Sequence, residues 1–194
     1  MSRRILILLA AVLLALFLFR DAGQTQPDGV LVAAAPLQTE VERSAFEFDG
    51  HRIEVLAGFE LDARVLGRER YWLDRESDLA KYDLALGWGR MSDSRVLEQI
   101  EISQSGRWYR WRAEQMPIPR REIERSSANM HLIPADAWIE KQIGKAGPGD
   151  LVRIKGYLVR AVSPEGWRWQ SSLTRDDTGN GACELIYVES FEIL

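Results

Sequence analysis

An uninterrupted apolar run from Ile5 to Phe19 constrains this chain more than any other feature. As a helix, these 15 residues measure about 22 Å, somewhat less than the ~30 Å hydrocarbon core of a bilayer. Arg4 and Arg20 flank the run and can extend their charged ends toward the lipid headgroups, which reduces this mismatch. A helix that is apolar on every side has no place on the surface of a small domain. Residues 1–20 are therefore expected to be a membrane anchor, either a transmembrane helix or an uncleaved signal.

A cleaved signal peptide is the alternative, because its apolar region is also about 7 to 15 residues long. Cleavage requires small residues just after that region, but Arg20 stands there and Ala33 to Ala35 lie well beyond it. We therefore favour the uncleaved anchor, in contact with the lipid bilayer through Ile5 to Phe19. Arg3 and Arg4 should stay in the cytoplasm. This predicts a single-pass inner-membrane protein with its C-terminal domain in the periplasm or at the cell exterior.

The charge of the remaining chain argues against nucleic acid as a partner. The sequence has 25 basic and 29 acidic residues, and three of the basic ones lie within residues 1–20. Residues 21–194 therefore carry a net charge of −7, which repels phosphate backbones. The one cysteine, Cys183, cannot form a disulfide within the chain, so the fold depends on its apolar core.

Three regions are expected along the chain: the anchor over 1–20, a flexible tether over 21–43, and a globular β-rich domain over 44–194. The tether is rich in Gly, Pro, Gln and Ala without a helical or strand period. In the domain, strand-like alternation recurs at 46–55, 61–65, 152–158 and 183–193, with Asp49-Gly50 as a hairpin signal and a break at Ala57-Gly58.

Two or three short helices are expected between these strands. Residues 134–144 form the best candidate, with Trp138, Ile139 and Ile143 on one face, and a shorter helix is expected near residues 93–100. The sequence thus predicts a β-rich α+β fold, in which the strands form a small, partly open antiparallel barrel of OB-like type.

The tripeptide Asp177-Thr178-Gly179 matches the active-site loop of aspartic proteases. Such proteases need two of these loops, and the chain has one. Asp176 and Asp177 are also candidate calcium ligands, together with Asn180 and Glu184, but the full spacing of a calcium loop is absent. The favoured interpretation is a polar turn between two strands, with no metal bound.

Residues 107–112, with the sequence RWYRWR, interleave aromatic and basic side chains. Such a strand can stack on sugars or bases and pair with anions. The ligand-binding candidates are Arg107, Trp108, Arg110 and Trp111. The favoured alternative is a strand whose Tyr109 and Trp111 are buried while Trp108 and the arginines face solvent.

His131 lies at an expected junction between a loop and a helix, where it is interpreted as a group that satisfies local hydrogen bonds. A hydrolase could instead use His131 with Asp177 or Cys183 as its catalytic residues. The chain contains no Gly-x-Ser-x-Gly motif, and its histidines and cysteine lack the paired spacing of a zinc site. No cofactor is therefore expected.

Four stretches together resemble an uncharacterised family of bacterial single-pass membrane-anchored proteins with one β-rich, OB-like domain outside the cytoplasm. These are residues 84–94, 102–112, 129–136 and 171–189. The resemblance extends over most of residues 45–194 and implies a bacterial inner-membrane location. It implies no activity, cofactor or catalytic residue.

Together these features predict a membrane-anchored extracytoplasmic binding or accessory module, with an envelope protein, a glycan or a small ligand as its partner. Two alternatives stay open, namely the hydrolase described above and a structural subunit of a cell-envelope complex. A geometric test separates the first of these from the binding module. Convergence of His131, Asp176 or Asp177, Cys183 and the Arg110 face in one cleft would favour the enzyme.

Overall fold

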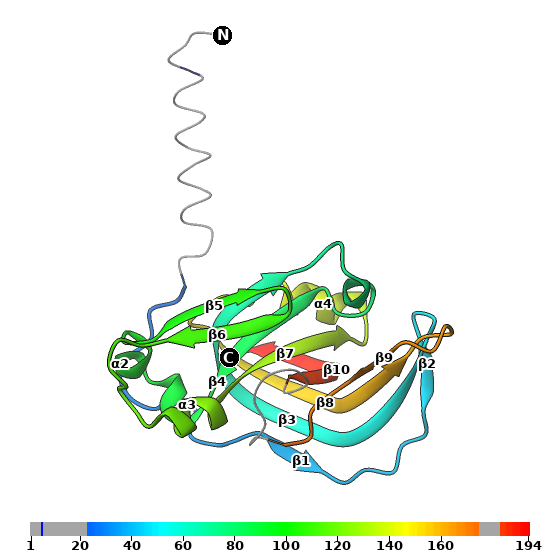
Figure 1. Cartoon of the computed structure of the whole chain (residues 1–194), viewed down its shortest axis with the longest axis horizontal. Helices are drawn as coiled ribbons and strands as arrows, with labels where there is room; N and C mark the ends of the chain where they lie inside the picture. Colours follow the sequence, from blue (N-terminus) through cyan, green and yellow to red (C-terminus); the bar gives the residue numbers. More distant parts are fainter. Residues whose placement is uncertain (1–4, 6–22, 175–182) are drawn as a thin grey trace.

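The computed structural model describes residue 5, residues 23–174 and residues 183–194. They form a β-rich α+β domain with one mixed sheet and a separate hairpin (Figure 1). The strands are β1 (Leu37–Thr39), β2 (Phe46–Phe48), β3 (His51–Arg70), β4 (Tyr82–Gly87), β5 (Glu101–Ser105), β6 (Trp108–Arg112), β7 (Ser127–Pro134), β8 (Leu151–Val162), β9 (Arg168–Gln170) and β10 (Glu184–Ile193). The helices are α2 (Ser94–Leu97), α3 (Arg120–Arg125) and α4 (Ala137–Ile143), with 3₁₀ turns η1 (Arg75–Asp78) and η2 (Gly89–Ser92). In these parts of the chain, no helix is long and apolar enough to span a bilayer.

The long strand β3 closes much of the sheet into a ring. Its first part pairs with β8, from Arg52 opposite Val162 to Arg64 opposite Leu151, and its last part pairs with β4. Strand β4 pairs with β7, β7 with β10, and β10 with β8, so the order β3–β4–β7–β10–β8 returns to β3. The short strands β1, β2 and β9 extend the sheet beyond the ring. The β-rich α+β class predicted from the sequence is therefore confirmed.

The prediction that all strands are antiparallel is wrong, because the sheet is mixed. Strand β10 runs parallel to β7, with Leu185 opposite His131, whereas every other pairing between the described strands is antiparallel. The chain leaves β7 through α4, returns along β8, and then places β10 between these two strands. Residue alternation reveals which side chains point inward, but it carries no information about strand direction.

The hairpin expected at Asp49-Gly50 is present and joins β2 to β3. Both turn residues have positive φ, 44° for Asp49 and 72° for Gly50, as a two-residue turn of type I′ requires. The predicted break at Ala57-Gly58 does not interrupt the strand, because β3 continues to Arg70. The irregularity is absorbed as a bulge against β8, between Val55 and Ala57.

Helix α4 confirms the strongest helix prediction but begins later than expected. The Asp136 carboxylate caps it by accepting hydrogen bonds from the backbone N–H groups of Trp138 and Ile139, each at 2.8 Å. Ile139 and Ile143 are buried, whereas Trp138 is 62% exposed, so the prediction that all three share one face is wrong. Consecutive helical residues point about 100° apart, so Trp138 and Ile139 cannot share a face. Ile139 and Ile143 are four residues apart, lie on the same face and are both buried.

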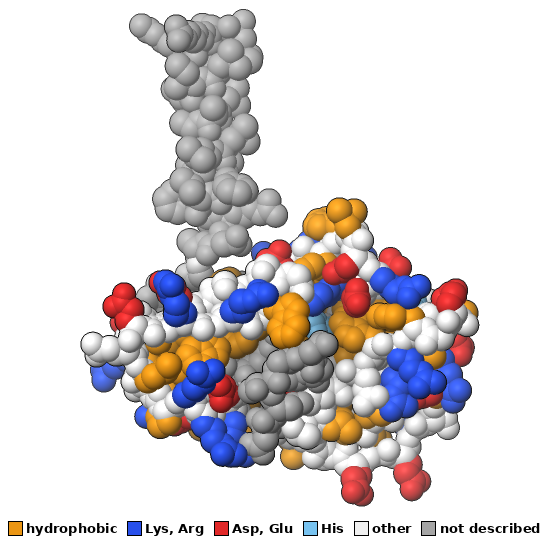
Figure 2. Space-filling view, in the orientation of Figure 1, with side chains coloured by type: hydrophobic (Ala, Val, Ile, Leu, Met, Phe, Trp, Pro, Cys, Tyr) orange, Lys and Arg blue, Asp and Glu red, His pale blue; other side chains and the backbone are white. Residues whose placement is uncertain are grey.

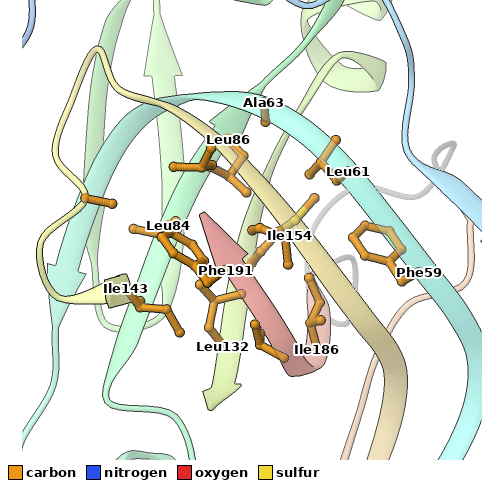
Figure 3. Packing of buried hydrophobic residues seen from close by; sticks show 14 of the residues in the cluster. Phe59, Leu61, Ala63, Leu84, Leu86, Leu132, Ile143, Ile154, Ile186 and Phe191 are labelled. Atoms are coloured by element: carbon orange, nitrogen blue, oxygen red, sulfur yellow. The ribbon is translucent and has the colours of Figure 1, made fainter. Parts of the chain in front are cut away.

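The ring encloses the main core (Figure 3). Helix α4 contributes Ile139 and Ile143, and the strands supply most of the remaining side chains. The labelled members are Phe59, Leu61, Ala63, Leu84, Leu86, Leu132, Ile143, Ile154, Ile186 and Phe191. Gly156 of β8 lies against the Tyr187 carbonyl of β10 so closely that a Cβ would collide with it. Glycine is therefore required where these two strands meet.

Much of the stretch expected to be a flexible tether lies along the body instead. The Gln24 N–H donates to the Pro148 carbonyl at 2.9 Å, Val32 is buried in the main core, and β1 pairs with β3. A single buried valine and a three-residue strand give no periodic signal, so the sequence pattern did not reveal these contacts. In the described part of the chain, bonding to the body is thus already present at Gln24, well before residue 44.

Candidate functional site

Strands β4 and β7 carry polar side chains on the side that points away from the main core. Leu84 and Leu132 point into the ring, so Asp83 and His131, one residue earlier on each strand, point outward. Asp83 and His131 are directly opposite one another in the antiparallel register, as are Ala85 and Asn129. We call the outward side of these strands, with Asp83, Asn129 and His131, the outer face.

Asp83 is the centre of the outer face and has no solvent exposure. Its Oδ1 lies 2.7 Å from Arg107 Nη1 and 2.9 Å from His131 Nδ1. Its Oδ2 accepts a hydrogen bond from Asn129 Nδ2 at 3.1 Å. A buried carboxylate costs several kcal/mol unless it is paired, so one carboxylate with two basic partners and an amide donor is an electrostatically complete arrangement.

Arg107 reaches Asp83 from the tip of the β5–β6 hairpin, where its φ of 67° is uncommon for a residue other than glycine. Its Nε and Nη2 both donate to the Asp74 carboxylate at 2.8 Å, and this bond is the main reason that the pKa of Asp74 is lowered. The guanidinium also lies 3.9 Å from the Tyr71 ring centroid, and the Arg107 N–H donates to the Tyr71 hydroxyl. Burial raises the pKa of that hydroxyl to about 12. These contacts fix the hairpin over the outer face.

His131 is buried, with 4% of its surface exposed. Burial acts to lower its pKa, but contacts with Asp83 and Cys183 outweigh burial and raise the pKa to about 9. The 2.9 Å approach of Nδ1 to Asp83 is an ion pair that lacks the alignment of a hydrogen bond. Trp169 of β9 covers the imidazole, with 4.9 Å between ring centroids. A buried, charged histidine is therefore sandwiched between a carboxylate, a thiol and an indole.

Cys183 lies immediately before β10 and is half-buried. The parallel register places Leu185 beside His131, and Cys183, two residues earlier, points to the same side of the sheet. The Cys183 carbonyl accepts a hydrogen bond from the Ser172 N–H at 3.0 Å, which fixes the backbone there. A thiol beside a cationic imidazole is the arrangement in which cysteine acts as a nucleophile.

A row of aromatic rings runs from His131 through Trp169 and Trp167 to His51. Trp169 is 6.1 Å from Trp167, and Trp167 is 6.1 Å from His51, between ring centroids. Two guanidinium groups lie near these indoles, Arg107 at 5.7 Å from Trp169 and Arg75 at 5.4 Å from Trp167. Flat apolar surfaces with cations beside them suit sugars and aromatic or charged groups of peptides.

The structure brings together some of the residues predicted from the sequence and separates others. His131 and Cys183 are in contact, although His131 lies inside β7 and not at a junction between a loop and a helix. Arg107 belongs to the same cluster. Asp176 and Asp177 lie outside the described residues. Within residues 23–174 and 183–194, no three His, Cys, Asp or Glu side chains are arranged to hold a metal ion.

The other members of the RWYRWR stretch do not join this cluster. Trp108 is exposed, and Arg110 is exposed and donates to the Ser105 hydroxyl at 3.0 Å. Trp111 packs against the small apolar cluster beneath α2 and α3, and Tyr109 is partly buried. Strand β6 therefore has the alternation expected of a strand with one buried aromatic side.

Sequence reasoning missed Asp74, Asp83, Asn129 and Trp169. Asp83 alone carries a signal, because it is an acid at the head of the apolar stretch DLALG and so stands where a strand is buried. The other three become site residues only because the hairpin and β9 fold over the outer face. No family model, no curated protein and no solved structure matches the chain.

Proposed function

We propose that this chain is a single-pass protein of the bacterial inner membrane whose extracytoplasmic domain is an OB-like binding module. The anchor is the run Ile5–Phe19. The OB-like assignment is supported by the five-stranded ring β3–β4–β7–β10–β8. OB barrels bind their ligands on the face of the second and third strands, between the loops that join the first to the second strand and the fourth to the fifth.

The observation that carries the proposal is the position of the site on that ring. Strands β4 and β7 are the second and third strands of the ring, and they bear Asp83 and His131. Tyr71 and Asp74 lie between β3 and β4, while Trp167 and Trp169 lie between β8 and β10. Polar and aromatic groups from distant parts of the chain thus meet where an OB-like barrel would hold its ligand.

The ligand class that fits best is a glycan or a peptide of the cell envelope. The indoles of Trp167 and Trp169 provide flat apolar surfaces, and Arg75 provides a cation beside them. Figure 2 shows acidic and basic side chains interspersed over one face of the molecule, with no continuous basic track for a phosphate backbone. This module holds its ligand close to the membrane.

Binding to the full-length protein in detergent micelles tests this proposal. The probes are soluble cell-wall glycan fragments and a random peptide library, and binding is followed by calorimetry. Trp169→Ala removes the indole over His131, whereas the matched variant Trp138→Ala removes an exposed indole on α4. We expect Trp169→Ala to lose binding and Trp138→Ala to retain it. Equal binding by both variants, or no binding to either probe class, contradicts the proposal.

A thiol hydrolase is the second candidate, and the contact between His131 and Cys183 favours it. In this reaction the Cys183 thiolate attacks the carbonyl carbon of an ester, and the His131 imidazolium gives its proton to the departing alcohol. Water then attacks the thioester and gives a proton back to the imidazole, which releases the carboxylic acid and restores the thiolate. Asp83 stabilises the imidazolium before the thioester forms and after it is hydrolysed.

Hydrolysis of p-nitrophenyl acetate by the full-length protein tests this second candidate. Loss of the nucleophile in Cys183→Ala or of the acid–base group in His131→Gln should lower the rate on the order of 10²-fold or more. Asp177→Asn is the matched variant, because Asp177 is the alternative catalytic partner of His131. A rate that survives Cys183→Ala but falls in Asp177→Asn would assign the chemistry to the Asp-Thr-Gly loop instead.

A further inference from the structure

We propose that one edge of the domain rests on the bilayer and inserts Trp72 and Leu73 among the lipid headgroups. This edge consists of the segment between β3 and η1 together with α4. The inference rests on the proposed membrane anchor, and it adds a second membrane contact made by the folded domain itself. We propose that the lipid surface beside the anchor covers the exposed apolar side chains of this edge.

The side chains at this edge expose apolar surface that the fold does not cover. Leu73 is 100% exposed, Trp72 is 66% exposed and Trp138 of α4 is 62% exposed. An exposed leucine next to an exposed tryptophan is unfavourable in water and favourable at a membrane surface, where tryptophan is enriched. The Arg70 guanidinium stacks 3.5 Å from the Trp72 ring centroid, which provides a cation for lipid phosphates beside the indole.

The length of chain between the anchor and the body limits how far the body can lie from the lipid. The apolar run ends at Phe19, and the Gln24 N–H is already bonded to the Pro148 carbonyl at 2.9 Å. Five residues span at most about 18 Å even when fully extended. The part of the body around Pro148 must therefore lie close to the membrane surface.

The exposed aromatic residues belong to the same edge as this attachment point. Helix α4 leads through residues 144–147 directly to Pro148. Arg68, near the end of β3, donates to the carbonyls of Gly144 and Ala146 at 2.8 and 2.7 Å. In Figure 1 the coloured chain that begins at residue 23 and the segment after β3 both lie along the upper edge of the domain. The edge that the anchor holds near the bilayer thus carries Trp72, Leu73 and Trp138.

The charges along this edge are compatible with anionic lipid. Lys141 and Lys145 are exposed on and just after α4. Two nearby acids are occupied by basic partners, Glu140 by Lys81 at 3.0 Å and Asp74 by Arg107 at 2.8 Å. Exposed lysines at a membrane surface attract anionic headgroups.

Spin-label accessibility in full-length protein tests the contact. The protein is reconstituted into vesicles of phosphatidylcholine and phosphatidylglycerol, with Cys183→Ala to remove the native thiol. A nitroxide is attached at Leu73→Cys or, as the matched control, at Glu42→Cys. Glu42 lies in the exposed segment between β1 and β2, on the opposite side of the domain in Figure 1. We expect a water-soluble nickel complex to reach the Leu73 label several-fold less than the Glu42 label, while oxygen reaches it more.

Flotation of the same samples separates failure of the contact from failure of the anchor. If the protein floats with the vesicles and both labels are equally open to nickel, the bilayer contact is overturned and the anchor stands. Failure to float overturns the anchor and the contact together. Protection of the Leu73 label that disappears when the protein is diluted in lipid would identify a second copy of the chain as the occupant, and this also overturns the proposal.

Discussion

The two sides of strands β4 and β7 are built from different interactions. On the inner side, Leu84 and Leu132 pack in the main core without a polar atom among them. On the outer side, one position earlier on each strand, Asp83 and His131 form an ion pair that is just as buried. The inner side is held by burial of apolar area, which is non-directional, whereas the outer side depends on a few charges that must all be present. The inner side of these strands should therefore tolerate apolar substitutions, whereas the outer side should not tolerate the loss of a charged partner.

The sharpest test of this contrast is Asp83→Ala. It leaves Arg107 without one of its carboxylates and a buried His131 without its counter-ion, which should cost about 3–5 kcal/mol of unfolding free energy. Urea unfolding of the full-length protein at neutral pH measures this loss. Asp62→Ala is the matched control, because its ion pair with Arg153 is partly exposed to solvent, and it should cost much less than Asp83→Ala. Equal losses for the two variants would remove the distinction between the outer face and an ordinary surface.

Leu132→Ala probes the inner side of the same strand and should cost about 2–5 kcal/mol, since it opens a cavity in the ring. Unlike the loss from Asp83→Ala, this loss should not change with pH, because no titratable group is involved. The measurement is urea unfolding at pH 6.5 and at pH 9. A cost that varies strongly between these two conditions would show that the inner and outer sides are coupled.

The stability of the unaltered protein should fall as the pH rises from about 6.5 to 9. The pKa of His131 is raised from 6.5 to about 9 in the folded chain. Its favourable charge interaction is thus fully present below pH 6.5 and is lost as the pH rises through about 9, and it is worth at most about 3 kcal/mol. His131→Gln should flatten this part of the pH profile. A wild-type profile that is flat over this range would mean that His131 is neutral.

Asp74→Asn should have a small effect on stability, about 1 kcal/mol, because Arg107 keeps its bond to Asp83. The change should appear locally, as faster amide hydrogen exchange in β5 and β6, where the hairpin tip is held by Asp74. Exchange in β4 and β7 should stay as in the wild type. Faster exchange across the whole ring would instead make Asp74 part of the general core.

The fold was predictable to the extent that it depends on residue alternation and turn chemistry. Asp49-Gly50, the alternation in β8 and the helical pattern of residues 134–144 are local signals, and each gave the right element. The parallel pairing of β10 with β7 is a contact between distant segments and has no local signal. The prediction for Trp138 was wrong for a different reason, because consecutive helical residues point about 100° apart and only Ile139 and Ile143 lie on the buried face.

The candidate site was only partly predictable, since it is assembled from six separate segments. His131 and Cys183 stood out because each is rare in this chain. Arg107 was noticed for its aromatic neighbours, yet its observed partners are Asp74 and Asp83, which neighbour it only after the hairpin folds back. A rare residue type can be recognised in a sequence, whereas a carboxylate shared by Arg107 and His131 can be recognised only in the folded structure.

The protonation state of His131 tests the central claim most directly, namely that the outer face is a site organised around the Asp83 charge. Nuclear magnetic resonance of the full-length protein in micelles, with labelled histidine, follows the ring resonances between pH 5 and pH 10, and His131→Gln assigns them. We predict an imidazolium at pH 7.5 that titrates near pH 9, as the contacts with Asp83 and Cys183 require. A neutral imidazole at pH 7.5, titrating at or below 6.5, would contradict the account.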